Sequence, residues 1–264
     1  MHGPIPPGAL AGRRVLLAYG LFGEVIAALR PLGAEYMHAH VDWLRAAGAD
    51  VSVVRCPTTA PIARNAVRIR DALLADPRPA ILIGHSKGGL EALAALLEDR
   101  AAAHCAALVA LQSPFAGSPV ADVVCARRAL HRTAGTILRL IRGNGEGIRD
   151  LTTASRTAWN ATHVTEVAAL IARIPVVCVA TRVEEAGAYR PRPRHRLLAR
   201  WLERRGAGPN DGLVPVSSAL LPGARHIVLA GDHIAAAARG PGRDPEGILR
   251  RALAAVLDPA AQEA

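Results

Sequence analysis

The most informative segment of the sequence is Ala80-Ile81-Leu82-Ile83-Gly84-His85-Ser86-Lys87-Gly88-Gly89-Leu90-Glu91-Ala92-Leu93. Its first four residues are apolar and predict a buried strand, and its Ala/Leu-rich end predicts a helix. Between them stands a Gly-x-Ser-x-Gly motif. A serine on a sharp turn between a strand and a helix is the arrangement of a nucleophile elbow. The bland alternative is an ordinary turn in an α/β protein.

The chemistry of such an elbow explains the glycine spacing. Ser86 needs a tight, strained turn for its hydroxyl to project from the edge of a sheet, where side chains at Gly84 and Gly88 would collide. The N-terminus of the following helix favours a developing oxyanion beside the serine. We therefore predict that Ser86 is a nucleophile.

Similar alternation of short apolar strands with longer helices continues along the chain, without an internal repeat. It predicts an α/β fold with a mostly parallel, twisted sheet and helices on both faces. Ligands of such sheets bind at the carboxyl ends of the strands. We expect strands at 14–18, 51–54, 80–83, 106–111, 175–180 and 226–229, and helices at 36–48 (with Gly48 at its C-terminal end), 62–74, 197–205 and 245–257.

The strand rhythm stops between about residues 117 and 167. A long helical stretch at 121–141 and a shorter helix at 150–159 are expected in this segment. An insertion at the strand-end side would form a roof over the pocket. It is either a lid that moves or a pair of fixed packing helices. The Arg- and Pro-rich segment 182–209 is expected to be exposed.

Composition bounds the remaining possibilities. The 264 residues suffice for a single domain over 1–264, and no apolar run has the length of a membrane span. Its start does not resemble a signal peptide, so we expect a cytoplasmic protein, or a secreted one if the sequence was trimmed. The net charge is +10, Lys87 is the only lysine, and no aromatic interleaving accompanies the arginines. We expect a solvated basic surface and no nucleic-acid partner.

The four cysteines are Cys56, Cys105, Cys125 and Cys178, and they form no Cys-x-x-Cys motif. We expect neither a metal site nor a redox role for them. A Cys105–Cys125 pair stays open as an alternative.

A serine nucleophile needs a base and an orienting carboxylate, in the chain order Ser, acid, His on this fold. His195 lies among arginines and His226 opens a strand, whereas His233 follows the last strand and is chosen as the base. For the acid we choose Asp211, in an Asn-Asp-Gly turn, rather than the adjacent Asp232. The other carboxylates that we considered are Glu184, Glu185 and Glu203.

An oxyanion hole needs two backbone donors. The N–H of Lys87 follows the nucleophile, and the N–H of Leu21 lies in the glycine-rich turn after the first strand. We assign the oxyanion hole to these two groups. Phe22, Tyr19 and His85 are expected to contact the substrate.

Six segments of the chain, residues 19–23, 84–89, 113–122, 150–160, 210–214 and 231–233, carry recognisable motifs. Taken together, they resemble the bacterial triacylglycerol lipases and related serine esterases of the α/β-hydrolase fold. The resemblance implies the same triad of Ser86, Asp211 and His233, and a lid over residues 117–167. Tyr19 stands where that family has histidine, and Lys87 where it has Gln or Met. Ala235 replaces the aspartate of the calcium-binding members, so no metal site is expected.

The sequence therefore predicts a carboxylic ester hydrolase that uses a Ser-His-Asp triad and an acyl-enzyme, with no cofactor. Its expected substrate is a small-molecule or lipid ester, with transient contact to a lipid interface. An acyltransferase or thioesterase with the same triad is the alternative. A non-catalytic binding protein with a basic face is a third reading, and the oligomeric state stays open.

Overall fold

The computed structural model describes residues 5–21, 36–57, 59–130, 146–184 and 191–257. Its centre is a six-stranded sheet in the order β2-β1-β3-β4-β5-β6, and every neighbouring pair is parallel. The predicted parallel sheet is confirmed, with each strand within about two residues of its expected bounds. The strands are β1 (Arg14–Ala18), β2 (Asp50–Val53), β3 (Ala80–His85), β4 (Cys105–Leu111), β5 (Val176–Arg182) and β6 (Arg225–Ala230).

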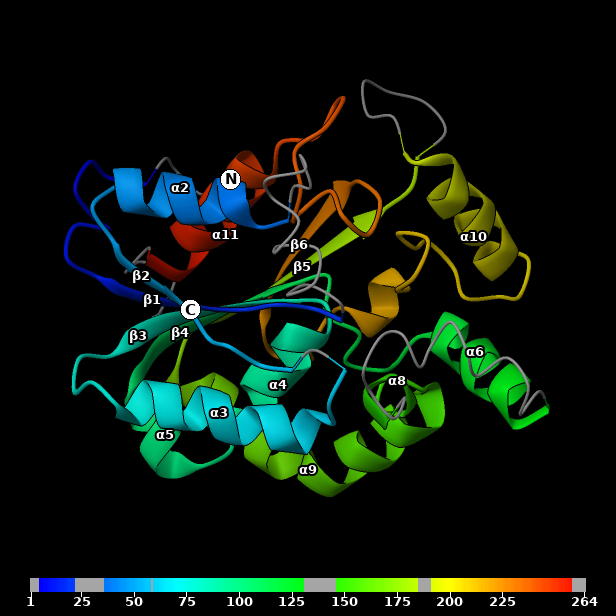
Figure 1. Ribbon diagram of the computed structural model, residues 1–264, viewed down its shortest axis with the longest axis horizontal. Helices are drawn as coiled ribbons and strands as arrows, with labels where there is room; N and C mark the ends of the chain where they lie inside the picture. The colour runs from blue at the N-terminus through cyan, green and yellow to red at the C-terminus, as the bar shows by residue number, and fades with distance from the viewer. Residues whose placement is uncertain (1–4, 22–35, 58, 131–145, 185–190, 258–264) are drawn as a thin grey trace.

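Helices cover both faces of this sheet, as predicted (Figure 1). Successive side chains of a strand point to opposite faces. In β1, Val15 and Leu17 therefore pack on one face and Leu16 and Ala18 on the other. The first face is covered by α2 (His38–Ala46) and α11 (Pro245–Leu257). The second is covered by α3 (Ile62–Leu74), α4 (Lys87–Leu96), α5 (Asp99–Ala103) and α9 (Thr153–Arg173).

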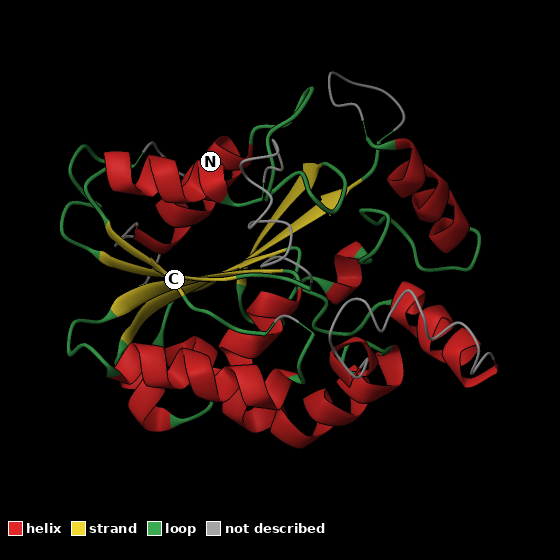
Figure 2. Cartoon of the chain, viewed as in Figure 1, coloured by secondary structure: helices red, strands yellow, loops and turns green. Residues whose placement is uncertain are grey.

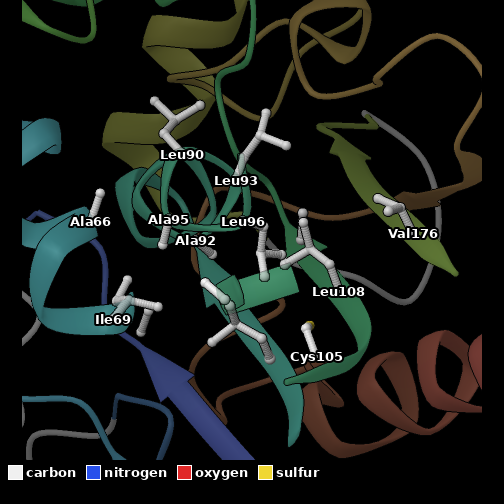
Figure 3. Close-up of a cluster of buried hydrophobic side chains, with 14 of the residues drawn as sticks. Ala66, Ile69, Leu90, Ala92, Leu93, Ala95, Leu96, Cys105, Leu108 and Val176 are labelled. Atoms are coloured by element: carbon white, nitrogen blue, oxygen red, sulfur yellow. The ribbon is translucent and has the colours of Figure 1, made fainter. Parts of the chain in front are cut away.

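Figure 3 shows the core on the second face, where buried side chains of α3 and α4 gather beside those of β4. Leu90 and Leu93 are fully buried, as are Ile69 of α3 and Leu108 of β4. Burying each such side chain contributes about 1.5–3 kcal/mol. This packing fixes the helix that follows Ser86, and with it the geometry of the elbow.

Two helix ends match their sequence signals. Gly48 has φ +85°, and the N–H of Ala49 donates to the Leu44 carbonyl after α2, so this glycine ends the helix as predicted. At the start of α11, Asp244 Oδ1 accepts from the N–H of Gly247 at 2.8 Å. Pro245 is the first residue of that helix, where its missing N–H has no consequence.

The segment expected as a lid differs in its helices. The helix expected at 121–141 is α6 (Pro119–Leu130), and residues 131–145 lie outside the described residues. After α8 (Glu146–Arg149), the helix expected at 150–159 extends to Arg173 as α9, with a kink at His163. Its second half is extended because Leu170 packs into the core against the sheet.

The basic segment 182–209 is also less exposed than predicted. It contains α10 (Pro193–Glu203), which buries His195, Ala199 and Leu202. Spacing of three or four residues places these side chains on one face of the helix, so its arginines are solvated while this face packs inward. A short 3₁₀ helix, η2 (Val216–Ser218), follows before β6.

The four cysteines are all among the described residues and none forms a disulfide, so Cys105 and Cys125 do not pair. No described helix is at once long and apolar enough to cross a membrane.

Acid is expected to destabilise the fold through two buried histidines. Burial lowers the pKa of His40 to about 4 and that of His85 to about 3, against roughly 6.5 in an unfolded chain. Between these values the unfolded state binds protons that the native state does not, so the free energy of unfolding rises with pH. The slope of the unfolding free energy against pH is proportional to the number of protons that unfolding takes up. We expect His40→Leu to reduce that number near pH 5 by about one, which lowers the slope by roughly 1.4 kcal/mol per pH unit. Urea unfolding at pH 7, 6 and 5 measures it, and equal slopes in both proteins would contradict it.

Candidate active site

The predicted elbow lies at the carboxyl end of β3. Ser86 has φ +54°, a strained conformation for a residue other than glycine, and its N–H donates to the Leu111 carbonyl at 2.8 Å. A Cβ at Gly84 would lie 2.6 Å from the Cα of Gly89. A Cβ at Gly88 would lie 2.3 Å from the Ala18 carbonyl oxygen. Both glycines are therefore required by close backbone approach.

The structure brings Ser86, His233 and Asp211 together. His233 Nε2 lies 3.0 Å from Ser86 Oγ, and His233 Nδ1 lies 2.8 Å from Asp211 Oδ2. The three side chains come from loops after β3, β6 and β5, at one edge of the sheet. A backbone hydrogen bond of 3.0 Å from the His233 N–H to the Asp211 carbonyl joins two of these loops.

The Asp211 carboxylate is held by its own turn. Its Oδ1 accepts from the N–H groups of Leu213 at 2.9 Å and Val214 at 2.7 Å. Its Oδ2 is left to face His233 Nδ1. An anionic acceptor at that position favours the tautomer with a proton on Nδ1. The Nε2 lone pair then faces the Ser86 hydroxyl, which is the geometry of a general base.

The rejected alternatives are engaged elsewhere. Asp232 Oδ2 lies 3.0 Å from His195 Nδ1 and 3.1 Å from Arg243 Nη2, and it accepts from the Arg192 N–H at 3.0 Å. His226 Nε2 donates to the Leu221 carbonyl at 2.6 Å. The buried Asp232 cluster therefore ties the start of α10 to the loop that carries His233.

An apolar cavity of about 360 Å³ opens at Ser86. It lies between the carboxyl edge of the sheet and the helices α6 and α8, which Figure 2 shows beyond the strand ends. Leu21, expected to supply an oxyanion donor, lines it, whereas Phe22 lies outside the described residues. The lining consists of Leu21, Ser86, Pro114, Ser118, Val120, Ala121, Val124, Ile148, Leu151, Leu213, Val214 and His233.

Two residues predicted to contact substrate lie elsewhere. Tyr19 and His85 are buried beneath the site and do not line the cavity. The Tyr19 ring packs edge-on against Tyr36, and His85 Nδ1 lies 2.8 Å from the Tyr36 hydroxyl oxygen. The prediction of direct substrate contact is corrected for both, because each of these side chains points into the protein.

Lys87 begins α4, so its N–H lies at the helix N-terminus beside the nucleophile. Its side chain, whose direction the sequence leaves open, is fully buried and forms an ion pair with Glu91 one turn later. Glu91 Oε1 also accepts from Asn65 Nδ2 at 2.7 Å. Breaking one member of a buried ion pair leaves an uncompensated charge.

We therefore expect Lys87→Met to lower the free energy of unfolding by about 3–5 kcal/mol. The double variant Lys87→Met/Glu91→Leu is expected to recover most of that loss, because neither charge stays buried. Urea unfolding of the two single variants and the double variant measures the coupling. A double variant no more stable than Lys87→Met would contradict this explanation.

Searches by structure show which solved proteins share this architecture. Mature lipase BlEst2 of Bacillus licheniformis is 20% identical, with a TM-score of 0.62 and coverage of 88% of each chain. The metagenomic carboxyl esterase MGS0156 is 23% identical with a TM-score of 0.64, covering 96% of this chain and 73% of its own. Lipase 1 of Pelosinus fermentans is 11% identical with a TM-score of 0.54, covering 96% and 99%.

The chain thus has the α/β-hydrolase fold, as the sequence predicts. No protein-family model matches the chain, and neither does any curated protein. At these identities the likeness establishes the fold and leaves the activity to be argued from the site.

Proposed function

We propose that this protein is a serine hydrolase that cleaves carboxylic esters through an acyl-enzyme. The observation that carries the proposal is the run of two hydrogen bonds from Asp211 through His233 to Ser86 Oγ, which ends at an apolar cavity. A serine hydroxyl is a weak nucleophile until a base accepts its proton, and this arrangement supplies the base and its orienting acid.

In the acylation step, Ser86 Oγ attacks the ester carbonyl carbon while His233 Nε2 takes the hydroxyl proton. Asp211 stabilises the resulting imidazolium. The N–H groups of Leu21 and Lys87 donate to the oxyanion of the tetrahedral intermediate. The intermediate collapses, His233 gives its proton to the alkoxide leaving group, and an alcohol departs.

In the deacylation step, water enters and His233 takes one of its protons as the water oxygen attacks the acyl-enzyme. A second oxyanion forms in the same hole. Its collapse breaks the bond to Ser86 Oγ, which regains the proton from His233 and releases the carboxylic acid. No cofactor enters either step.

The lining of the cavity supports the proposed class of substrate. Its described lining contains no Asp, Glu, Lys or Arg side chain, and its polar members are two serines and His233. Such a wall favours an uncharged acyl chain. A lipase and a carboxyl esterase are among the proteins that share the fold, in agreement with an ester substrate. Val120 of α6 and Ile148 of α8 belong to the wall of the cavity. We therefore propose that these two helices are the part of the 117–167 segment that lies next to the site.

A series of p-nitrophenyl esters of increasing acyl length tests the proposal. We expect hydrolysis of each soluble ester, together with covalent labelling by a fluorophosphonate. The rate of hydrolysis is also measured below and above the solubility limit of each ester. A lid that moves at a lipid interface predicts a jump in rate above that limit. Added alcohols or thiols separate hydrolysis from acyl transfer. If the folded protein shows no hydrolysis and no labelling, the proposal is refuted.

A further inference from the structure

Beneath the site, a run of buried polar side chains begins at the Tyr36 hydroxyl. The Gly20 N–H donates to Tyr36 Oη at 2.8 Å, and Tyr36 Oη lies 2.8 Å from His85 Nδ1. Burial raises the pKa of Tyr36, so its hydroxyl keeps its proton. Among the described residues, two groups lie within hydrogen-bond distance of this oxygen, and the Gly20 N–H can only donate to it, which leaves His85 Nδ1 as the acceptor for the proton. Tyr36 therefore donates to His85 Nδ1.

His85 continues the run toward the catalytic loop. Since Nδ1 accepts, the ring proton resides on Nε2, which lies 3.1 Å from the His233 carbonyl oxygen and 3.2 Å from Gln112 Oε1. Burial lowers the pKa of His85 to about 3, so the ring is neutral near pH 7. Nε2 can only donate, and both neighbours are acceptors.

Gln112 completes the connection from the end of β4. Its backbone has φ +52°, a second strained position beside that of Ser86. Its side-chain Nε2 donates to the Asp232 carbonyl at 2.8 Å and to the Thr181 hydroxyl. The carbonyls of two successive residues, Asp232 and His233, are thus held by this run.

None of these side chains lines the cavity or contacts Ser86 or Asp211 by a hydrogen bond. The His85 ring packs against the His233 ring, with 5.3 Å between the ring centroids. The hydrogen-bonded links to the site pass through the backbone at two points. One is Gly20, the residue before Leu21, and the other is His233 itself. Gly20 also lies directly over the nucleophile, where a Cβ would stand 2.9 Å from Ser86 Cβ.

We propose that Tyr36, His85 and Gln112 are positioning residues. They hold the N–H of Leu21, as oxyanion donor, and the His233 ring, as base, at a fixed position relative to each other. This inference rests on the proposed ester hydrolysis. The run of hydrogen bonds spans the loops after β1, β3, β4 and β6, so movement of one loop is opposed by the others. Catalytic groups misplaced by 1 Å cost roughly 100-fold in rate.

The test compares Tyr36→Phe, His85→Leu and His85→Gln with the wild type on a soluble p-nitrophenyl ester. Tyr36→Phe removes the donor to His85 and the acceptor for Gly20 while keeping the ring. We expect kcat to fall about 10- to 100-fold with KM changed less than threefold. His85→Leu is expected to lose as much. In His85→Gln the side-chain amide reaches the Nε2 position, so much of the rate should return.

Inhibition by phenylboronic acid gives an independent measurement, because its adduct with the serine is tetrahedral and resembles the transition state. Its inhibition constant is expected to weaken by the same factor as kcat/KM in each variant. Rates are divided by the active-site concentration from fluorophosphonate titration, so misfolded protein does not count. His104→Gln is the matched control, since that residue lies before β4 at the opposite edge of the sheet and should keep wild-type rates.

The outcomes separate the two hypotheses. If the wild-type protein does not hydrolyse esters, the proposed function is refuted. Normal kcat and boronate inhibition in titrated Tyr36→Phe and His85→Leu, with only a lower Tm, overturn the positioning role and leave the proposed function standing. Equal losses in His85→Gln and His85→Leu would likewise overturn the assignment of the Nε2 donor.

Discussion

Replacing Ser86 with alanine is expected to lower kcat for ester hydrolysis by about 10⁴-fold or more while the fold is kept. Ser86 Oγ is the only atom removed, and its described hydrogen bond is the one with His233 Nε2. Alanine tolerates the strained turn as well as serine does, since both carry a Cβ. The oxyanion donors and the cavity remain, so substrate binding is expected to persist. Rates divided by the concentration of folded protein measure the loss of kcat, and circular dichroism checks that the fold is kept.

The matched control is Ser52→Ala, since Ser52 lies exposed on β2, the edge strand farthest from β6. It should keep wild-type rates and fluorophosphonate labelling, whereas Ser86→Ala should lose both. Hydrolysis that survives in Ser86→Ala, or labelling at another residue, would show that Ser86 is not the nucleophile.

The second large effect is expected for Asp211→Asn, with kcat lower by about 10⁴-fold. The asparagine oxygen can still accept from the N–H groups of Leu213 and Val214, which leaves its NH₂ group facing His233 Nδ1. A donor at that position forces the ring proton onto Nε2. His233 Nε2 then points a proton at Ser86 Oγ and cannot accept one, although the geometry is nearly unchanged.

Asp99→Asn is the control for this substitution, because Asp99 is 86% exposed and lies on α5, away from the site. We expect its kinetics to match those of the wild type. The tautomer argument also predicts that Asp211→Asn keeps its thermal stability to within a few degrees. If activity falls only in proportion to the amount of folded protein, the tautomer argument is contradicted.

Much of the fold was predictable because its signals are local. The apolar runs of β1 and β3, the Gly-x-Ser-x-Gly spacing and the capping residues at Gly48 and Asp244 depend on near neighbours in the chain. The same holds for the choice of His233 and Asp211 as members of a candidate triad. Chain order and position after a strand place them at the carboxyl edge of a parallel sheet. Their catalytic roles remain predictions for the kinetics above.

The extent of α9 was less predictable, since Leu170 extends this helix through contacts with a distant part of the chain. Tyr36 and Gln112 were missed altogether. Gln112 had a signal, as the first polar residue after a buried strand. Tyr36 had none, because its partners Gly20 and His85 are distant in sequence and meet it only through folding.

The parallel sheet, the elbow and the three residues that meet at its edge could thus be predicted from the sequence, because periodicity, glycine spacing and strand ends are local features of the chain. The directions of the Lys87 and His85 side chains depend instead on contacts that form when the chain folds. A buried polar group is satisfied by whatever partner the fold brings to it, and for these two the partners are Glu91 and Tyr36. That is why one residue next to the nucleophile is half of an ion pair and the other belongs to a run of hydrogen bonds beneath the site.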